Sequence, residues 1–214
     1  MRSIFRSRVT AGLAAIVSSA VGLASCASEL TRTGASPAFI IVESVVAASG
    51  AEPDEFGAPL YSDVVTLVEQ ETASGPVRVP SIFSDVGQAR VRVSMKNPTN
   101  PTAPTSINSI TINRYRVEFR RSDGRNTPGV DVPHGFDGAT TFTVAADAVG
   151  TFSFEVVRHQ AKQEPPLRNL AYNGGSQIIS TIAEITFYGR DQAGNEVSAT
   201  GTLSVNFGDF GDPQ

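Results

Sequence analysis

The sequence predicts an all-β protein built as an antiparallel β-sandwich with long loops. Apolar and polar residues alternate with period two in successive segments, which places one face of each strand in a core and the other in water. Clusters of Gly, Asn and Asp separate these segments and supply residues that tolerate tight turns. Many short strands at this spacing are typical of a sandwich. We expect no long helix, although Asp85–Gln88 and Pro166–Ala171 could each hold a turn.

The alternation defines the strands in order along the chain. Phe39–Ala47 is rich in Val and Ile on both faces, as expected for a buried first strand, and a second apolar run covers Val64–Val68. The later strands each have one apolar face. The residues of these faces are Val91, Val93 and Met95; Tyr115, Val117 and Phe119; Phe152, Phe154 and Val156; Ile179, Ala183, Ile185 and Phe187; and Val197, Ala199, Leu203, Val205 and Phe207.

A change of phase interrupts one of these strands. Ile110 and Ile112 have the opposite parity to Tyr115 and Val117, although the alternation is continuous. The change predicts a β-bulge near Asn113. The alternative is that two strands meet there without a loop.

The connection Lys96–Ser106 contains three prolines in eleven residues. Proline cannot donate to a β-ladder, so this segment cannot be a central strand. We expect a long exposed loop.

The last predicted hairpin carries the motif Asp191-Gln-Ala-Gly-Asn195 between two alternating strands. This arrangement resembles the closing hairpin of bacterial Ig-like domains, which often have an Asp-x-Ala-Gly-Asn turn after an apolar strand. The resemblance covers about 30 residues and implies an Ig-like sandwich of the type that lacks a disulfide. It implies no activity.

Composition excludes several classes of protein. The chain has 214 residues, a formal charge of −4, 40% hydrophobic residues and 18% charged residues. These values argue against a polytopic membrane protein and against a disordered acidic chain. The weak net charge gives no electrostatic basis for nucleic-acid binding. A single Cys excludes an intramolecular disulfide and a multi-cysteine metal site.

The N-terminal segment has the features of a secretory signal peptide. Arg2, Arg6 and Arg8 precede an apolar stretch, Val9–Leu23, that is short for a transmembrane helix. Small residues follow the stretch, where a cleavage site is expected. The alternative is an uncleaved amphipathic anchor.

The end of this segment, Leu23-Ala24-Ser25-Cys26, resembles the lipobox of bacterial lipoproteins. The resemblance implies cleavage before Cys26 and attachment of diacylglycerol to its sulfur. Two or three acyl chains would anchor the protein stably, because each buried methylene contributes about 0.8 kcal/mol. Ala27 rather than Asp follows the Cys, which in families with an inner-membrane retention rule implies export to the outer membrane. The alternative for a single Cys is a small buried apolar side chain.

These boundaries divide the chain into three parts. We expect a signal peptide in residues 1–25, a lipidated N-terminus and tether in residues 26–37, and a β-sandwich domain in residues 38–214. The tether is small, polar and contains Gly and Pro. Cleavage would leave 189 residues with a side-chain charge of −7, because the first 25 residues contain three arginines and no acid.

Candidate catalytic groups are few. His134 and His159 are the only histidines, and no Gly-x-Ser-x-Gly motif accompanies them, so we expect neither a nucleophilic triad nor a zinc site. Glu52, Asp54 and Glu55 share one loop, which is more typical of a solvated turn than of two acids across a cleft. The sequence therefore predicts no catalytic residue and no enzymatic activity.

Calcium is the metal that the loops favour, because it takes oxygen ligands from carboxylates and carbonyls. The leading candidates are Asp191, Asn195 and Glu196 in the final turn. None has the spacing of an EF-hand, and the same residues are ordinary turn formers. Two other sets have a similar composition, Asp209 with Asp212, and Asp123 with Asn126 and Asp131.

Basic residues line the polar side of two predicted strands. One strand carries Arg90, Arg92 and Lys96, and the other carries Arg114, Arg116 and Arg120. If the strands are neighbours, the six cations form a patch for an anionic partner such as a lipopolysaccharide, an acidic glycan or a protein. The alternative is a solvated face whose charges pair across strands with Glu118, Glu155 and Glu184.

Together these features predict a non-enzymatic, lipid-anchored protein of the cell envelope that works as a structural or protein-interaction module. The alternative is a module that binds a glycan or Ca²⁺ through its loops. We expect no cofactor apart from the lipid on Cys26 and this candidate Ca²⁺. The expected partners are the membrane, through the lipid, and an envelope protein or anionic glycan, but not nucleic acid.

Overall fold

A computed structural model describes residues 34–99 and 104–210 of the chain. The prediction of an all-β protein is confirmed, because ten strands account for most of these residues. The strands are β1 (Ala38–Ala48), β2 (Leu60–Asp63), β3 (Thr66–Thr72), β4 (Gly75–Ser81), β5 (Asp85–Met95), β6 (Ile110–Arg120), β7 (Phe136–Val144), β8 (Val149–Val157), β9 (Ile179–Asp191) and β10 (Glu196–Gly208). The short helical segments are η1 (Ser106–Asn108), α3 (His159–Lys162) and η2 (Leu167–Leu170).

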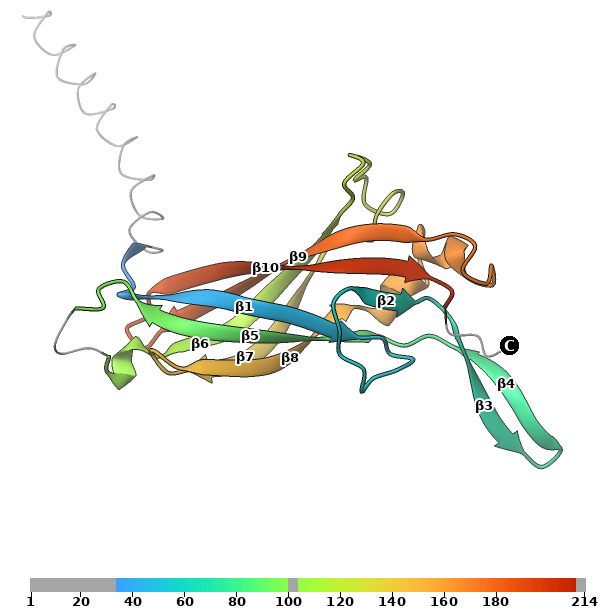
Figure 1. Ribbon diagram of the computed structural model, residues 1–214, viewed down its shortest axis with the longest axis horizontal. Helices are drawn as coiled ribbons and strands as arrows, with labels where there is room; N and C mark the ends of the chain where they lie inside the picture. Colours follow the sequence, from blue (N-terminus) through green and yellow to red (C-terminus); the bar gives the residue numbers. More distant parts are fainter. Residues whose placement is uncertain (1–33, 100–103, 211–214) are drawn as a thin grey trace, which may run out of the picture.

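The strands form two larger sheets and one separate hairpin (Figure 1). One sheet has three strands in the order β1-β5-β8, and the other has five in the order β2-β10-β9-β6-β7. All pairings are antiparallel except that β2 runs parallel to β10. Because β1 contacts β10 and β7 contacts β8, the two sheets lie against each other along both sides.

Aromatic side chains join the two sheets across the core. The ring of Phe187 on β9 lies 5.3 Å, between centroids, from the rings of both Phe152 and Phe154 on β8. Tyr115 on β6 spans the same space, and its hydroxyl accepts the backbone N–H of Glu155 at 3.2 Å. Edge-to-face aromatic pairs of this kind add about 0.5–1.5 kcal/mol each to the free energy gained by burial.

The predicted apolar faces point into this core. On β5, β6 and β8, every residue of the predicted face is buried. On β9 and β10, Ile179 and Ala199 are partly buried and the other predicted residues are buried. The alternation therefore identified the core side of five strands correctly.

The first strand is less buried than the sequence predicts. β1 lies at the edge of the three-stranded sheet, and its residues alternate between buried and exposed or half-buried positions along much of the strand. Phe39 is exposed, whereas Ala38 and Ile40 are buried. A register shift between Val42 and Ser44 interrupts the pairing of β1 with β5.

The predicted β-bulge in β6 is confirmed. The register shifts between Ile112 and Arg114 in the pairing of β6 with both β7 and β9. The bulge at Asn113 changes the parity of the strand, so Ile112 and Tyr115 both face the core.

The expected helical turns have different outcomes. Pro166–Ala171 contains the 3-10 helix η2, as predicted. Asp85–Gln88 does not form a helical turn. It is the start of β5 and pairs with both β1 and β8. The connection Lys96–Ser106 joins β5 to η1, and residues 100–103 within it lie outside the described residues.

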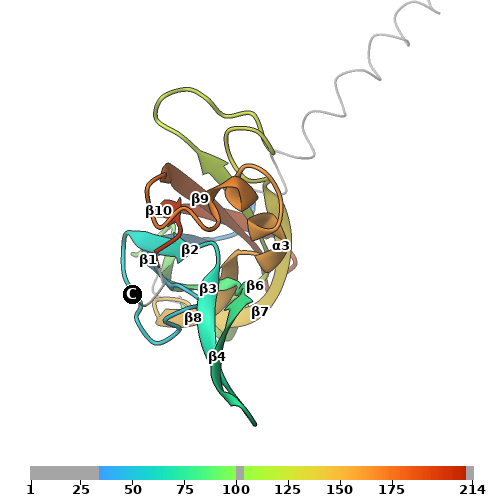
Figure 2. The same ribbon diagram turned by 90° about the vertical axis from the view of Figure 1, so that its right-hand side faces the viewer.

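The β3–β4 hairpin projects from the body of the molecule (Figures 1 and 2). The prediction of one apolar strand over Val64–Val68 is therefore wrong in part. Val64 and Val65 are buried, but β3 begins only at Thr66. Val68 lies on the projecting hairpin and is exposed.

Candidate functional site

The β3–β4 hairpin exposes an uncharged apolar stripe. Val68 pairs with Val79 across the two strands, and Val77 lies on the same face. Their exposed fractions are 38%, 37% and 48%. Glu69 and Glu71 lie on the opposite face, and both are exposed. In the described part of the chain, neither strand of the hairpin pairs with any other strand.

The two edges of this hairpin have different hydrogen-bonding capacity. Thr72 and Gly75 flank a two-residue turn and therefore form a hydrogen-bonded pair. The alternation of the ladder then directs the backbone groups of residues 76, 78 and 80 away from β3, and those of residues 67, 69 and 71 away from β4. Positions 76 and 80 are Pro76 and Pro80, which have no N–H, so the β4 edge keeps one donor of three. The β3 edge keeps all three of its outward N–H donors.

Sequence patterning does not single out this hairpin, because its valines have the alternation of an ordinary core strand. The two prolines, four residues apart on one strand, are the signal that could have marked an edge.

The six basic residues do not form one patch. Arg90 and Arg92 lie on β5 in the three-stranded sheet, whereas Arg114, Arg116 and Arg120 lie on β6 in the five-stranded sheet. The two strands are not neighbours, and their outward faces belong to different sheets. Lys96 follows β5, and its ammonium group donates to the carbonyl of Gly34 at 3.0 Å. The condition for a single patch of six cations, that the two strands are neighbours, is therefore not met.

The arginines on both sheets pair with carboxylates, as the alternative interpretation predicted. Glu43 accepts from Arg90 at 2.8 Å and from Arg92 at 2.6 Å. The hydrogen bond from Arg90 is the largest effect on Glu43, and with Arg92 it lowers the pKa of this carboxyl. The two arginines on β5 thus share one carboxylate, which offsets one of their two positive charges.

On β6 the pairing uses two of the three predicted acids. Arg120 donates to Glu184 at 2.8 Å, and Arg116 donates to Glu118 at the same distance. Asp137 on β7 is a further partner, 2.7 Å from Arg116. In the described residues, none of these ion pairs involves Glu155.

Two of the three candidate calcium ligands of the final turn, Asp191 and Asn195, lie together, and hydrogen bonds join them directly. Asp191 Oδ1 accepts the backbone N–H groups of Ala193 at 3.0 Å and Asn195 at 2.8 Å. Asp191 Oδ2 accepts the side-chain amide of Asn195 at 2.8 Å. Burial alone would raise the pKa of Asp191, but the hydrogen bonds from Asn195 and its neighbours outweigh it and lower the pKa. Glu196 pairs instead with Arg190 at 2.9 Å.

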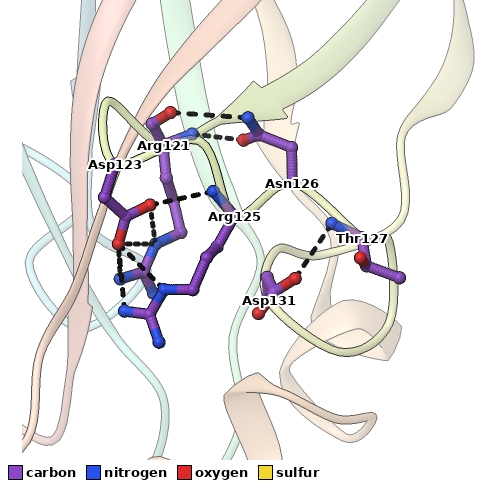
Figure 3. Close-up of polar contacts among 6 residues, drawn as sticks. All are labelled: Arg121, Asp123, Arg125, Asn126, Thr127 and Asp131. Carbon is purple, nitrogen blue, oxygen red and sulfur yellow. Dashed lines mark hydrogen bonds and ion pairs between the residues drawn. The ribbon is translucent and has the colours of Figure 1, made fainter.

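Asp123 organises the loop between β6 and β7 (Figure 3). Its carboxylate accepts from the guanidinium groups of Arg121 at 2.6 Å and Arg125 at 2.9 Å. The hydrogen bond from Arg121, assisted by Arg125, holds the pKa of Asp123 well below its usual range. This carboxylate is therefore engaged by two cations of its own chain.

The other two oxygen-bearing side chains of this loop also bind its backbone (Figure 3). Asn126 Oδ1 accepts the backbone N–H of Arg121 at 2.6 Å, and Asp131 Oδ2 accepts that of Thr127 at 3.1 Å. Asp123, Asn126 and Asp131 thus stabilise the loop separately. In the residues that the structure describes, no group of three or more His, Cys, Asp or Glu side chains is placed to hold a metal ion.

His134 and His159 are both exposed. His159 Nδ1 lies 3.5 Å from Ser84 Oγ, which also accepts the backbone N–H of His159 at 3.2 Å. Among the described residues, no carboxylate hydrogen-bonds to His159, so the contact lacks the group that would orient a catalytic imidazole. Glu52, Asp54 and Glu55 lie in the exposed loop between β1 and β2.

A buried ionic network was not predicted. Lys162 of α3 is 1% exposed, and its ammonium group lies 2.7 Å from Oδ1 of the fully buried Asp85. Asp85 also accepts the hydroxyl of Ser62 at 2.5 Å and the backbone N–H of Gly50 at 2.9 Å. The network joins α3, β5, β2 and the loop after β1.

Cys26 and the preceding apolar segment lie outside the described residues, as do most of the tether and Asp212. Within residues 34–99 and 104–210, no helix is long and apolar enough to cross a membrane. Comparison of the chain with protein-family models, with curated proteins and with solved structures finds no match in any of the three.

Proposed function

We propose that the protein is exported and anchored by a lipid on Cys26, with the outer membrane as its location, and that it works there as a protein-interaction module. We further propose that its two packed sheets are an Ig-like sandwich. The lipobox-like segment Leu23-Ala24-Ser25-Cys26 supports the anchor, and the Asp191–Asn195 turn between β9 and β10 supports the Ig-like assignment.

The observation that carries the interaction role is the asymmetry of the β3–β4 hairpin. The hairpin has three exposed valines and two unequal edges. The β3 edge keeps its three outward backbone N–H donors, whereas two prolines leave the β4 edge with one. An exposed strand edge is a template for another strand, and addition of a strand is a common mode of peptide recognition. We therefore assign β3 as the strand to which a partner pairs.

Charge indicates what kind of strand fits. Glu69 and Glu71 lie on one face of β3, where Arg78 of β4 is the cross-strand neighbour of Glu69 and Pro76 is that of Glu71. Two copies of β3 paired with each other would still place carboxylates beside carboxylates along the new edge. Like charges opposite each other destabilise a sheet, whereas opposite charges stabilise it by roughly 0.2–1 kcal/mol per pair. The partner is thus an extended segment with Lys or Arg on the Glu face and small or β-branched residues on the valine face.

Crosslinking from the two edges tests this assignment. With a photoreactive residue at position 69 on β3, we expect a discrete crosslinked product in intact cells. We expect none from position 78 on β4, a substitution that keeps both prolines of that edge. Glu69→Pro removes an outward N–H without breaking the hairpin ladder, so it should abolish a product formed from position 71. Glu69→Ala keeps the N–H and should retain it, while Glu69→Lys should weaken it. Equal products from both edges, or none from β3, would refute strand addition.

Acylation tests the anchor separately. We expect Cys26→Ser to abolish incorporation of labelled fatty acid and to release the protein from the membrane fraction, because no other thiol exists in the chain. Ser25→Ala keeps a small residue before the Cys and should be processed normally. A Cys26→Ser protein that is still acylated would contradict the proposal.

A further inference from the structure

The outer side of the five-stranded sheet has a pocket at the bulge of β6. This bulge pocket lies where β6, β9 and β10 run side by side, and its volume is about 330 Å³. Six of the residues that line it carry polar side chains: Asn113, Arg114, Tyr188, Arg190, Glu196 and Ser198. Their neighbours Tyr115 and Phe187 are buried in the core, so the pocket is on the opposite face of the sheet. Its size is at the lower end of pockets that hold small molecules, about 300–1,000 Å³.

The β-bulge shapes this pocket. Because the register shifts at Asn113, the consecutive residues Asn113 and Arg114 are both exposed and both line the pocket. Gly189 on β9 lets the two strands approach each other here, since a Cβ atom at this position would lie only 2.7 Å from the backbone oxygen of Thr111. Bulges are frequent next to active sites, where they re-aim a side chain. In β6 the re-aimed side chain is that of Arg114.

The guanidinium group of Arg114 is held in place but keeps its hydrogen-bond donors. It lies over the ring of Tyr188, 4.2 Å from the centroid. Its ion pair with Asp137 measures 3.7 Å, which is too long for a hydrogen bond, and Asp137 accepts from Arg116 at 2.7 Å instead. Arg116 and Arg120 each bind a carboxylate at 2.8 Å. Among the three arginines of β6, Arg114 is therefore the one without a carboxylate at hydrogen-bond distance.

The charges that line the pocket do not cancel. Arg190 pairs with Glu196 at 2.9 Å, which leaves the positive charge of Arg114 in excess. A guanidinium group binds a carboxylate through two parallel N–H donors, and stacking on an aromatic ring fixes the direction of these donors. Glu196 disfavours a second anionic group, because like charges repel. The pocket thus complements a ligand with a single negative charge.

The other polar groups of the pocket fit hydroxyl groups. The amide of Asn113 and the hydroxyls of Tyr188 and Ser198 can each donate and accept a hydrogen bond, and the carboxylate of Glu196 accepts. A sugar ring presents several hydroxyl groups within a small volume, so it can use all of these partners. An acid with an apolar body would leave them without hydrogen bonds to the ligand.

We propose that the bulge pocket binds a sugar with one carboxylate, of the hexuronic acid class. The carboxylate binds Arg114, and the hydroxyl groups bind Asn113, Ser198 and Glu196. The site is separate from the β3–β4 hairpin, so it adds a ligand to the proposed interaction role and does not depend on it.

Saturation-transfer NMR of the full chain in detergent, with D-glucuronate as the ligand, tests the site. We expect the wild type to bind glucuronate, and to bind its uncharged methyl ester at least about tenfold more weakly, because the ester lacks the charge that Arg114 recognises. Acetate should also bind at least about tenfold more weakly, because it lacks the hydroxyl groups. No saturation transfer to glucuronate, or equal affinity for glucuronate and either control ligand, would overturn the proposal.

Two arginines of the same strand locate the effect. Arg114→Gln should weaken glucuronate binding by at least about tenfold, and Arg114→Lys should weaken it similarly, because an ammonium group lacks the planar fork of donors. Arg120→Gln makes the same change outside the pocket and should bind glucuronate as the wild type does. An unchanged Tm shows that each variant is folded, as expected for exposed side chains. Full binding by Arg114→Gln, or an equal loss in Arg120→Gln, would contradict the assignment.

Discussion

Lys162 is fully enclosed, and its ammonium group pairs with Asp85, 77 residues earlier in the chain. Taking two charges out of water costs free energy that their attraction recovers only when the remaining hydrogen bonds are also made. Ser62 and Gly50 make those bonds to Asp85. The pair therefore specifies where α3 rests against β5, and it is sensitive to loss of either partner.

We expect Lys162→Met to lower the free energy of unfolding by about 3–5 kcal/mol near neutral pH, because it leaves a buried carboxylate without its cation. Burial raises the pKa of Asp85, and Lys162 opposes that rise, so the variant should raise it further. A carboxyl with a raised pKa stabilises the folded state below its unfolded pKa, and this contribution is lost as pH rises through the folded value. The deficit in the variant should thus be smaller at about pH 5 than at about pH 7, as measured by urea denaturation.

The double variant Asp85→Asn/Lys162→Met is the control for this prediction. It removes both charges, so it should recover part of the lost stability and lose the dependence on pH. Equal deficits at both pH values in the single variant would mean that Asp85 does not carry the effect.

At the scale of elements, two hairpins of similar form have opposite roles. The β9–β10 hairpin places Ile185, Phe187 and Val205 in the core, all of them fully buried. The β3–β4 hairpin has no buried residue, and its contacts with the sheets are few. An isolated two-stranded hairpin is marginally stable in water, so the second one depends on its attachment to the body.

Replacing residues 67–80 by two glycines should therefore change the free energy of unfolding by only about 1 kcal/mol or less. Thr66 and Ser81 are cross-strand partners, so a short turn can connect them. Urea denaturation of the truncated chain measures the change. In the same experiment Phe187→Ala, which opens a cavity between the sheets, should lower the free energy of unfolding by about 3–5 kcal/mol. A truncated chain that fails to fold would show that the hairpin belongs to the stable core.

At the scale of the whole molecule, alternation alone predicted which side of most strands is buried. Val91, Val117 and Phe187 could be placed in the core because burial follows from the local period of two. The bulge at Asn113 could be predicted for the same reason, since a change of parity is visible in neighbouring residues.

Features that depend on distant pairing could not be predicted in this way. Arg90 and Arg116 have the same local pattern, yet their strands belong to different sheets. The contact of Lys162 with Asp85 and the turn that joins Gly174 to Asp209 each link segments far apart in sequence. Val77 has the alternation of a core residue, and only the absence of a covering sheet in the described structure makes it exposed.

The prolines of β4 have a consequence for stoichiometry. Pro76 and Pro80 remove two of the three outward N–H donors on that side, so under the proposed strand addition we expect a partner strand to join the hairpin at β3. A hairpin that could pair along both edges could extend into an open-ended stack of strands, because each added strand presents a new edge to the next molecule. With the β4 side disfavoured, the proposal predicts that each hairpin binds one partner strand directly.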